Sequence, residues 1–411
     1  MEPSFWSRPS GDVAVDIARL HAEAPLDWFE EPDPGDTPIE RGPGYWAVCR
    51  HDDVRTVSRD PAVYSSAAGV TVTNAPPEFV EFFSSMIGMD DPRHARLRRI
   101  VAKGFTPKML TDLDGTVQQV ATSVVDGICE RGSCDFVTEV AAALPLKIVC
   151  DLMGIPEQHY ATVFANSNII LGITDDEFRP PDVDFYTALL NAGAELAAVM
   201  NEVAEDKRDG DGTDLTSVLV NADLPDDQLS QSDLASFFIL LVIAGNETTR
   251  NAISWGLSYL TDNPDQRAIW ADDFERVAPT AVEEIVRLSS PVTYMRRTTT
   301  TDTVLAGQPL AAGDKVAMFY AAANRDPAVF DDPDRFDVLR DPNPQYGYGG
   351  PGPHYCLGAH LARREITVVY RELFARLPDI VAAGEPDVLH ASFIHGVKHL
   401  PAEFTPTRAA A

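Results

Sequence analysis

The sequence of 411 residues predicts a mainly α-helical fold with a minor part of β-sheet. Apolar residues recur at helical spacing through many long segments, which is typical of helices that pack on a common core. Strand-like stretches are confined to regions near residues 40–65, 290–310 and 377–404. Neither a low-complexity linker nor a repeat of fixed period divides the chain, so we expect a single domain over residues 1–411.

The N-terminal half is expected to alternate helices with short irregular segments. A helix over residues 12–24 stops at Pro25, and a strand over 45–49 precedes a helix over 51–59. Regular spacing fails from residue 65 to 91, where we expect a long loop that folds its apolar side chains inward and serves function. Further helices are expected at residues 94–103, 111–131, 137–153, 156–172 and 184–208.

The C-terminal half adds one very long helix and most of the strands. The polar, Pro-containing segment 173–183 between two predicted helices indicates a mobile lid. Ser230 or Ser232 caps the long helix, which runs to about residue 262. A helix, a strand, a small hairpin and a strand-rich end are then expected at residues 277–289, 292–300, 303–307 and 377–404.

The composition restricts the possible partners and location. The chain has 33 Lys and Arg against 63 Asp and Glu, a formal net charge of −30, which argues against nucleic acid or an anionic membrane as a general partner. Its five cysteines form no CxxC pair or zinc spacing, which suits a reducing cytoplasm. No membrane span and no signal-peptide pattern is visible, so we expect a cytoplasmic protein.

One cysteine lies in a loop that neither a helix nor a strand pattern explains. Glycines and prolines crowd residues 349–353, ahead of His354 and Cys356, and hold the backbone on a rigid irregular path. Helical spacing resumes at Leu361, which places Cys356 at a helix N-terminus, where free N–H groups favour a thiolate. Such a thiolate can serve as the ligand of a metal ion. The loop alone leaves open the alternative of a buried free cysteine in a turn.

A second motif follows the apolar part of the long helix, where the chain reads Ala-Gly-Asn-Glu-Thr-Thr over residues 244–249. A buried Glu247 is costly unless it is paired or has a function, and Gly245 weakens the helix by roughly 1 kcal/mol relative to Ala. Together they predict a local widening of the helix that admits water or a small molecule. The alternative is that Thr248 bonds to its own helix while Glu247 points to solvent.

The order of these motifs resembles that of bacterial cytochrome P450s. The loop from Tyr348 to Gly358, the acid–alcohol pair Glu247-Thr248, and Glu284-x-x-Arg287, with opposite charges one helical turn apart, all have counterparts in that family. The resemblance implies the P450 fold, a triangular prism of helices around a buried haem b. It also implies that the Cys356 thiolate is the axial ligand of the haem iron.

The resemblance further implies a catalytic pair and a structural lock. Thr248 would hydrogen-bond dioxygen above the iron, and Glu247 would help to relay protons. Glu284 and Arg287 would be joined by Arg335 to lock the side of the protein that carries the cysteine.

Cofactor contacts are implied in the same way. Strand alternation allows only one of Arg296 and Arg297 to point inward, and the family pattern favours Arg297. Ala244 would stay small so that dioxygen and substrate fit over the iron. The residues expected to contact the haem or its propionates are His94, Arg98, Ala244, Arg297, Gly350, His354 and Cys356.

The family resemblance implies a monooxygenase that depends on redox partners. The chain has no G-x-G-x-x-G after a strand and no iron–sulfur set of cysteines, so we expect electrons from NAD(P)H to arrive through a ferredoxin reductase and a ferredoxin. An acidic donor would dock on a local basic face, and a monomer is expected. That face consists of Arg98, Arg99, Lys103, Lys108, Arg363 and Arg364.

The substrate is expected to be apolar, because the positions that face it in the family are mostly apolar here. Several stretches, among them residues 86–94, 244–254 and 393–398, resemble mycobacterial P450s that hydroxylate methyl-branched lipids or cholesterol side chains. Residues 70–75 and 178–184 look less like that branch, so its substrate does not follow. The expected substrate contacts are Val72, Phe83, Met86, Ile87, Leu240, Ala244, Val292, Phe393 and Ile394.

Three other functions stay open at this point. The enzyme could hydroxylate a terpenoid or polyketide of secondary metabolism instead of a fatty acid, isoprenoid or sterol side chain. A thiolate-haem gas sensor would not need the pair Glu247-Thr248, and a peroxide-driven enzyme usually lacks it.

Overall fold

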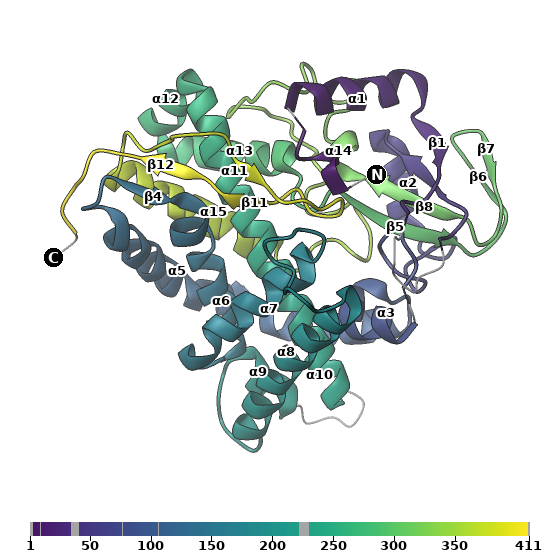
Figure 1. Cartoon of the computed structure of the whole chain (residues 1–411), viewed down its shortest axis with the longest axis horizontal. Coiled ribbons are helices and arrows are strands. Elements are labelled where there is room, and N and C mark those ends of the chain that lie inside the picture. The colour runs from purple at the N-terminus through teal and green to yellow at the C-terminus, as the bar shows by residue number, and fades with distance from the viewer. Residues whose placement is uncertain are drawn as a thin grey trace.

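The computed structural model describes residues 3–8, 10–33, 41–75, 77–105, 107–221 and 230–409. Helices dominate and the sheet is minor, as the sequence predicts (Figure 1). No helix within these ranges is long and apolar enough to cross a membrane. The α-helices are α1 (Ser10–Glu23), α2 (His51–Arg59), α3 (Pro77–Ser84), α4 (Arg93–Val101), α5 (Pro107–Ile128), α6 (Ala143–Met153), α7 (Tyr160–Gly172), α8 (Phe185–Lys207), α9 (Leu215–Val220), α10 (Gln231–Val242), α11 (Thr248–Asp262), α12 (Pro264–Asp272), α13 (Phe274–Ser289), α14 (Tyr320–Ala323) and α15 (Ala359–Arg376).

The largest sheet lies near the N-terminus, on the right of Figure 1, with strand order β1-β2-β8-β5-β3. Its pairs are antiparallel except β2 with β8. Smaller sheets have the orders β4-β12-β9, β10-β11 and β6-β7. The strands are β1 (Leu26–Phe29), β2 (Tyr45–Val48), β3 (Tyr64–Ser65), β4 (Ser133–Asp135), β5 (Tyr294–Thr299), β6 (Thr303–Leu305), β7 (Gln308–Leu310), β8 (Lys315–Phe319), β9 (Val381–Ala382), β10 (Asp387–Val388), β11 (Val397–His399) and β12 (Pro401–Glu403).

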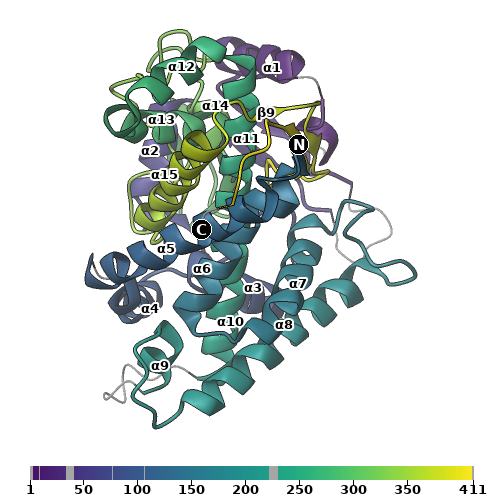
Figure 2. The same ribbon diagram turned by 90° about the vertical axis from the view of Figure 1, so that its left-hand side faces the viewer.

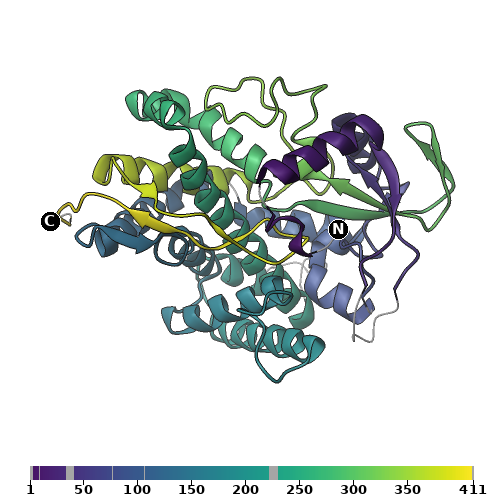
Figure 3. The ribbon, with the colours of Figure 1, turned by 45° about the horizontal axis from the view of Figure 1, so that its top comes forward.

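The N-terminal residues contact the C-terminal strand region near the large sheet. In Figure 3 the C-terminal strands extend from the C-terminus back toward the first residues of the chain. The Trp6 indole donates a hydrogen bond to the Ser392 carbonyl at 3.3 Å. The turn before β11 is therefore held from the N-terminal side as well as by its own sheet.

The long central helix, which consists of α10, the segment Ile243–Glu247 and α11, runs through the middle of the molecule in Figure 2 and contributes side chains to the two largest apolar cores. One core gathers side chains of α4, α6, α8 and α10, and its last fully buried member on the central helix is Val242. The other core gathers α5, α11, α13 and α15, and its first member on that helix is Ala252. Residues 243–251 are thus left at the boundary, where a binding site can open without breaking either core.

Two predictions about this helix are confirmed. Ser230 caps it, with a reciprocal capping box to Asp233. The segment Ile243–Glu247 is a π-helix, the local widening that Gly245 and Glu247 predict.

The segment from residue 65 to 91 contains more regular structure than predicted. It includes α3 and a 3₁₀ turn, η2 (Ser85–Gly88). The apolar residues of this segment recur at helical spacing, which favours a helix, whereas the small residues and prolines around them favour a loop. The residues with this spacing are Phe79, Phe82, Phe83 and Met86. A Cβ on Gly193 of α8 would lie only 2.7 Å from Phe82 and 2.9 Å from Phe83, so α3 packs closely on that helix.

A buried ion network joins α13 to the loop after α14. Arg287 and Glu284 are fully buried and form two hydrogen bonds, of 2.7 and 2.8 Å. The third member of the network is Arg340, whose Nε lies 3.1 Å from Glu284 Oε1. The expectation of Arg335 was wrong, because the Arg335 side chain is exposed and only its carbonyl enters the network, as an acceptor for Arg287 and Arg340.

This arrangement predicts different costs for two arginine substitutions. Arg340→Ala removes a hydrogen bond to a buried charge and should lower the free energy of unfolding by about 1–3 kcal/mol. Arg335→Ala keeps the carbonyl that the network uses and should change it by no more than about 0.5 kcal/mol. Chemical unfolding of both variants tests this; equal losses would contradict the assignment of Arg340.

Candidate active site

A cavity lies at the boundary between the two cores. Its walls come from η2, α6, the central helix, β5 and the loop that precedes α15. Cys356 lines it together with Ala244 and Thr248 of the central helix. The structure therefore brings the cysteine loop and the widened helix, more than 100 residues apart in sequence, to one space.

The cysteine loop has its shape because its glycines lie against α2. Gly349 has a φ of +84°, which favours glycine. A Cβ on Gly350 would lie 2.8 Å from Ser58 Oγ, and one on Gly352 would lie 2.2 Å from the Ser58 carbonyl oxygen. The loop closes when the Cys356 amide donates to the Tyr348 carbonyl at 3.0 Å, and α15 begins three residues later.

The thiol of Cys356 faces the cavity and has groups around it that favour a thiolate. Burial raises its pKa, while the Gly358 amide N–H and the guanidiniums of Arg98 and Arg363 act to lower it. These N–H and cationic groups are what a thiolate bound to a metal requires. The position at a helix start, predicted from spacing, is confirmed.

Four basic side chains gather beside this loop. Arg98, Arg297 and His354 line the cavity, and the ring of His94 lies 4.2 Å from that of His354. Arg297 points inward and donates to the Arg296 carbonyl at 2.8 Å, whereas Arg296 turns to the carbonyls of Ala68 and Thr71. The expected choice of Arg297 agrees with this geometry.

Among the described residues this cluster has only a partial counter-charge, at its His94 end. His94 lies 3.5 Å from the exposed Asp91, and its Nε2 is buried without a partner, while the Arg297 guanidinium makes no ion pair within the described ranges. Burial and the nearby positive charges lower the pKa of His354 to about 3. A buried cation such as Arg297 is costly unless an anion meets it, and the histidine rings can donate N–H groups, so this cluster fits the two carboxylates of a haem.

The acid–alcohol pair is split between two surroundings. The Thr248 hydroxyl donates to the Ala244 carbonyl at 2.6 Å, so the alternative of back-bonding to its own helix is the arrangement seen. Thr248 nevertheless lines the cavity. Glu247 is fully buried behind the helix in contact with Arg250, so it does not point to solvent.

The apolar side of the cavity contains part of the expected substrate set. Met86, Ile87, Leu240, Ala244 and Val292 line it. Four other expected contacts lie in the surrounding cores instead, because the chain turns their side chains away from this space; they are Val72, Phe83, Phe393 and Ile394.

Some lining residues were not expected. Phe237 and Leu241 follow from the helical spacing of Leu240 and Ala244, and that periodicity could have identified them. Tyr320 also lines the cavity, and the small residues that follow it form no sequence pattern that would predict this position. Glu365 of α15 also lines the cavity, and burial raises its pKa to about 8, so it is mostly neutral at pH 7.

The basic face expected around the cysteine is partly neutralised. Arg363 pairs with Glu283 and lies 4.2 Å from the ring centre of Tyr348, and Arg98 donates to the Tyr355 carbonyl at 2.6 Å. Arg99 and Arg364 also have interaction partners. The side chains of Lys103 and Lys108 lie outside the described residues.

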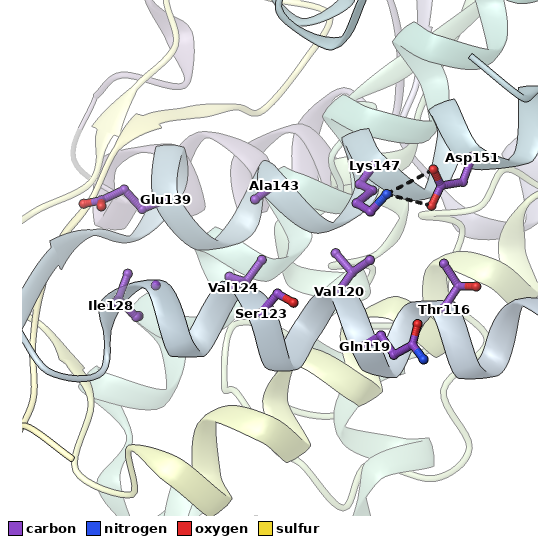
Figure 4. Close-up of a pocket in the computed structure, with 11 residues that line it drawn as sticks. Thr116, Gln119, Val120, Ser123, Val124, Ile128, Glu139, Ala143, Lys147 and Asp151 are labelled. Carbon is purple, nitrogen blue, oxygen red and sulfur yellow. Dashed lines mark hydrogen bonds and ion pairs between the residues drawn. The ribbon is translucent and has the colours of Figure 1, made fainter. Parts of the chain in front are cut away.

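A second hollow lies between α5 and α6, away from the cysteine loop (Figure 4). It is lined by Thr116, Gln119 and Val120 of α5, and Lys147 on the facing helix pairs with Asp151. Its lining contains no cysteine and no excess of cations, so it does not fit a haem.

The segment 173–183, expected to be a lid, is tied to the C-terminal strands by charged groups. Glu177 accepts from Lys398 and from His399 Nε2, at 3.1 and 2.9 Å. His399 Nδ1 contacts Asp135 on its other side, and Lys398 lies 3.4 Å from Asp175. Two cations on β11 thus hold the segment against the sheet.

This contact should weaken as pH rises. The hydrogen bond with Asp135, followed by that with Glu177, raises the pKa of His399, so the protonated form stabilises the contact. The stabilisation is complete below the ordinary histidine pKa of about 6.5 and is lost as pH rises through the raised value. Proteolysis after Arg179 should therefore be slower at low than at high pH.

His399→Gln provides the control for that measurement. The variant keeps a hydrogen-bonding side chain without the charge. Its cleavage rate, divided by that of the unmodified protein, should therefore approach one at high pH. A ratio that stays constant across pH would contradict the role of His399.

Comparison with known proteins identifies the family. The sequence profile described as Cytochrome P450 matches residues 191–377. The methyl-branched lipid omega-hydroxylase of Mycobacterium tuberculosis (strain ATCC 25618 / H37Rv) is 46% identical over 401 residues, which cover 97% of this chain and 92% of that protein. The chain belongs to the cytochrome P450 family.

Two further similarities support this assignment of the P450. The steroid C26-monooxygenase of the same strain is 34% identical over 398 residues, covering 95% of this chain and 89% of that protein. The structure of Mycobacterium marinum cytochrome P450 CYP268A2 in complex with pseudoionone has a TM-score of 0.93 and 38% identity, covering 98% of this chain and 97% of that chain. The P450 fold is confirmed, and the protein is a P450 monooxygenase, a family that uses haem and dioxygen.

Proposed function

We propose that this P450 hydroxylates an unactivated C–H bond of a methyl-branched fatty acid, isoprenoid or sterol side chain. The observation that carries the proposal is one cavity lined by the Cys356 thiol, by buried cations and by an apolar wall that includes Leu240 and Val292. Haem b, when bound, would supply the activation of dioxygen with two electrons and two protons, so that one oxygen atom enters the substrate and the other leaves as water.

The residues around the cavity would have separate roles in binding the haem and in catalysis. Cys356 would bind the iron, and the four basic groups would bind the two propionates: His94, Arg98, Arg297 and His354. The Thr248 hydroxyl would turn away from the Ala244 carbonyl. Its proton would then lie in the cavity where dioxygen is cleaved. Small side chains at Ala244 and Gly245 leave room beside that hydroxyl.

The apolar wall and the two named relatives support a lipid substrate. Nothing polar from η2 or α10 faces the cavity among the described lining residues, so an alkyl chain can be bound mainly by burial of its surface. Titration with methyl-branched fatty acids, terpenoids, polyketides and sterols, scored by the haem Soret shift and then by product analysis, tests the choice of class. Preferred binding and turnover of a polyketide would overturn it.

The electrons would come from NAD(P)H through a ferredoxin reductase and a ferredoxin. Support comes from the arginines of α4 and of the start of α15, which flank the cysteine loop in a chain of net charge −30. Turnover with that pair, compared with turnover driven by hydrogen peroxide, separates a monooxygenase from a peroxide-driven enzyme.

Cys356→Ala should abolish the spectrum of a thiolate-ligated iron. The reduced protein under carbon monoxide should show the absorption band of a thiolate–iron–CO complex, and the variant should not, because no cysteine thiol is left among the described lining residues. Cys49→Ala is the matched control, since Cys49 is a buried cysteine that is not among the residues lining the cavity. Loss of the band in the control alone, or its presence in Cys356→Ala, would overturn the ligand.

Thr248→Ala should separate electron consumption from product formation. The variant keeps the cysteine loop and the apolar wall, so haem and substrate binding should be retained, while the proton that Thr248 holds is lost. We expect most NAD(P)H to form hydrogen peroxide, with product per NAD(P)H reduced by about tenfold or more. Thr248→Ser is the control, and full coupling in Thr248→Ala would contradict the role.

A further inference from the structure

Arg250 is the charged residue in direct contact with Glu247. The Glu247 side chain is 1% exposed, and its Oε2 contacts Arg250 Nη2, three residues further along the same helix. Its Oε1 has no partner among the described residues. Burial raises the pKa of Glu247, and the charge and hydrogen bond of Arg250 oppose this rise. Arg250 is thus the identified charge that keeps the acid ionisable inside the protein.

Arg250 is itself held by a different helix. Its side chain is 4% exposed, and its Nη1 donates to Asn168 Oδ1 of α7 at 2.9 Å. α7 ends at Gly172 and leads directly into the segment 173–183. The guanidinium therefore links the acid on the central helix to α7.

Unpartnered polar atoms surround this link. Arg250 Nε and both amide atoms of Asn246 are buried without a partner, as is Glu247 Oε1. They lie within one turn and a half of the π-helix Ile243–Glu247. Buried polar groups of this kind are normally satisfied by ordered water, and water beside a carboxylate can carry protons toward Thr248.

We propose that Arg250 is a positioning residue for Glu247 in proton delivery to Thr248, and that Asn168 of α7 holds the Arg250 guanidinium in the orientation that meets the acid. The inference rests on the proposed monooxygenase function and names residues that neither the sequence motif nor the cavity lining identifies. Charge neutralisation alone would not need Asn168, because a buried amide contributes no charge.

Three substitutions and one matched control test this inference. Arg250→Met should lower product per NAD(P)H by about 10–100-fold, the usual effect of losing a residue that orients a functional group, and should increase the solvent isotope effect. Arg250→Lys should restore part of the loss through its charge. Asn168→Ala should give a smaller loss, of about threefold or more, with substrate Kd changed by less than about twofold. Asn166→Ala also removes an interhelical bond of α7, to Glu195 at 2.8 Å, and should leave coupling unchanged.

A second readout does not depend on turnover. In Arg250→Met the pKa of Glu247 should rise further, because the opposing charge and hydrogen bond are gone. An additional infrared band of a protonated carboxylic acid, beyond the one that Glu365 contributes in the unmodified protein, should then be present at neutral pH. Glu247→Gln combined with Arg250→Met should lack that band, which assigns it.

The outcomes separate this inference from the proposed function. If the unmodified protein shows no thiolate–iron–CO band or no hydroxylation, the proposed function fails. If it turns over and Arg250→Met keeps native coupling, isotope effect and infrared spectrum, the positioning role is wrong. Equal losses in Asn168→Ala and Asn166→Ala would overturn the link to α7. If Arg250→Met does not fold, Arg250→Lys and Asn168→Ala decide: native coupling in both overturns the inference.

Discussion

The structure depends on keeping two arginine cations, the uncharged ring of His354 and a thiol together in its interior. Arg98, Arg297 and His354 face one cavity with Cys356, and no acid within the described residues pairs with Arg297 or His354. Removing such groups from water is costly unless an anion and a metal meet them. The two apolar cores, the rigid loop and the ion network of Glu284 all hold this otherwise unfavourable group in place.

The central helix makes the cavity possible by departing from regular α-helix. The π-turn Ile243–Glu247 presents Ala244 to the cavity and turns Glu247 to the opposite side. One element thereby separates an apolar chamber from a polar, buried acid that is only a few residues away. The monooxygenase chemistry of the family requires both, since the substrate needs a dry surface and dioxygen cleavage needs protons.

Much of this arrangement could be predicted from sequence because its signals are local. Glycine and proline crowding marked the loop of Cys356, and Gly245 with Glu247 marked the widened helix. What could not be predicted depends on contacts between distant segments. Arg335 and Arg340 are equivalent in sequence pattern, and only the path of the loop shows that Arg340 reaches Glu284. The sequence does not distinguish Phe393 and Val72 from apolar residues that line the cavity. Their side chains pack in another core, beside the large sheet.

The close contact between the cysteine loop and α2 has a consequence for how the protein matures. Gly350 and Gly352 rest on Ser58, and α2 follows directly from β2 of the large sheet. The axial thiol is therefore positioned by an element some 300 residues upstream rather than by its own neighbours alone. Cofactor capture must wait until both ends of the chain have been synthesised and have docked, which ties acquisition of the prosthetic group to completion of the whole fold.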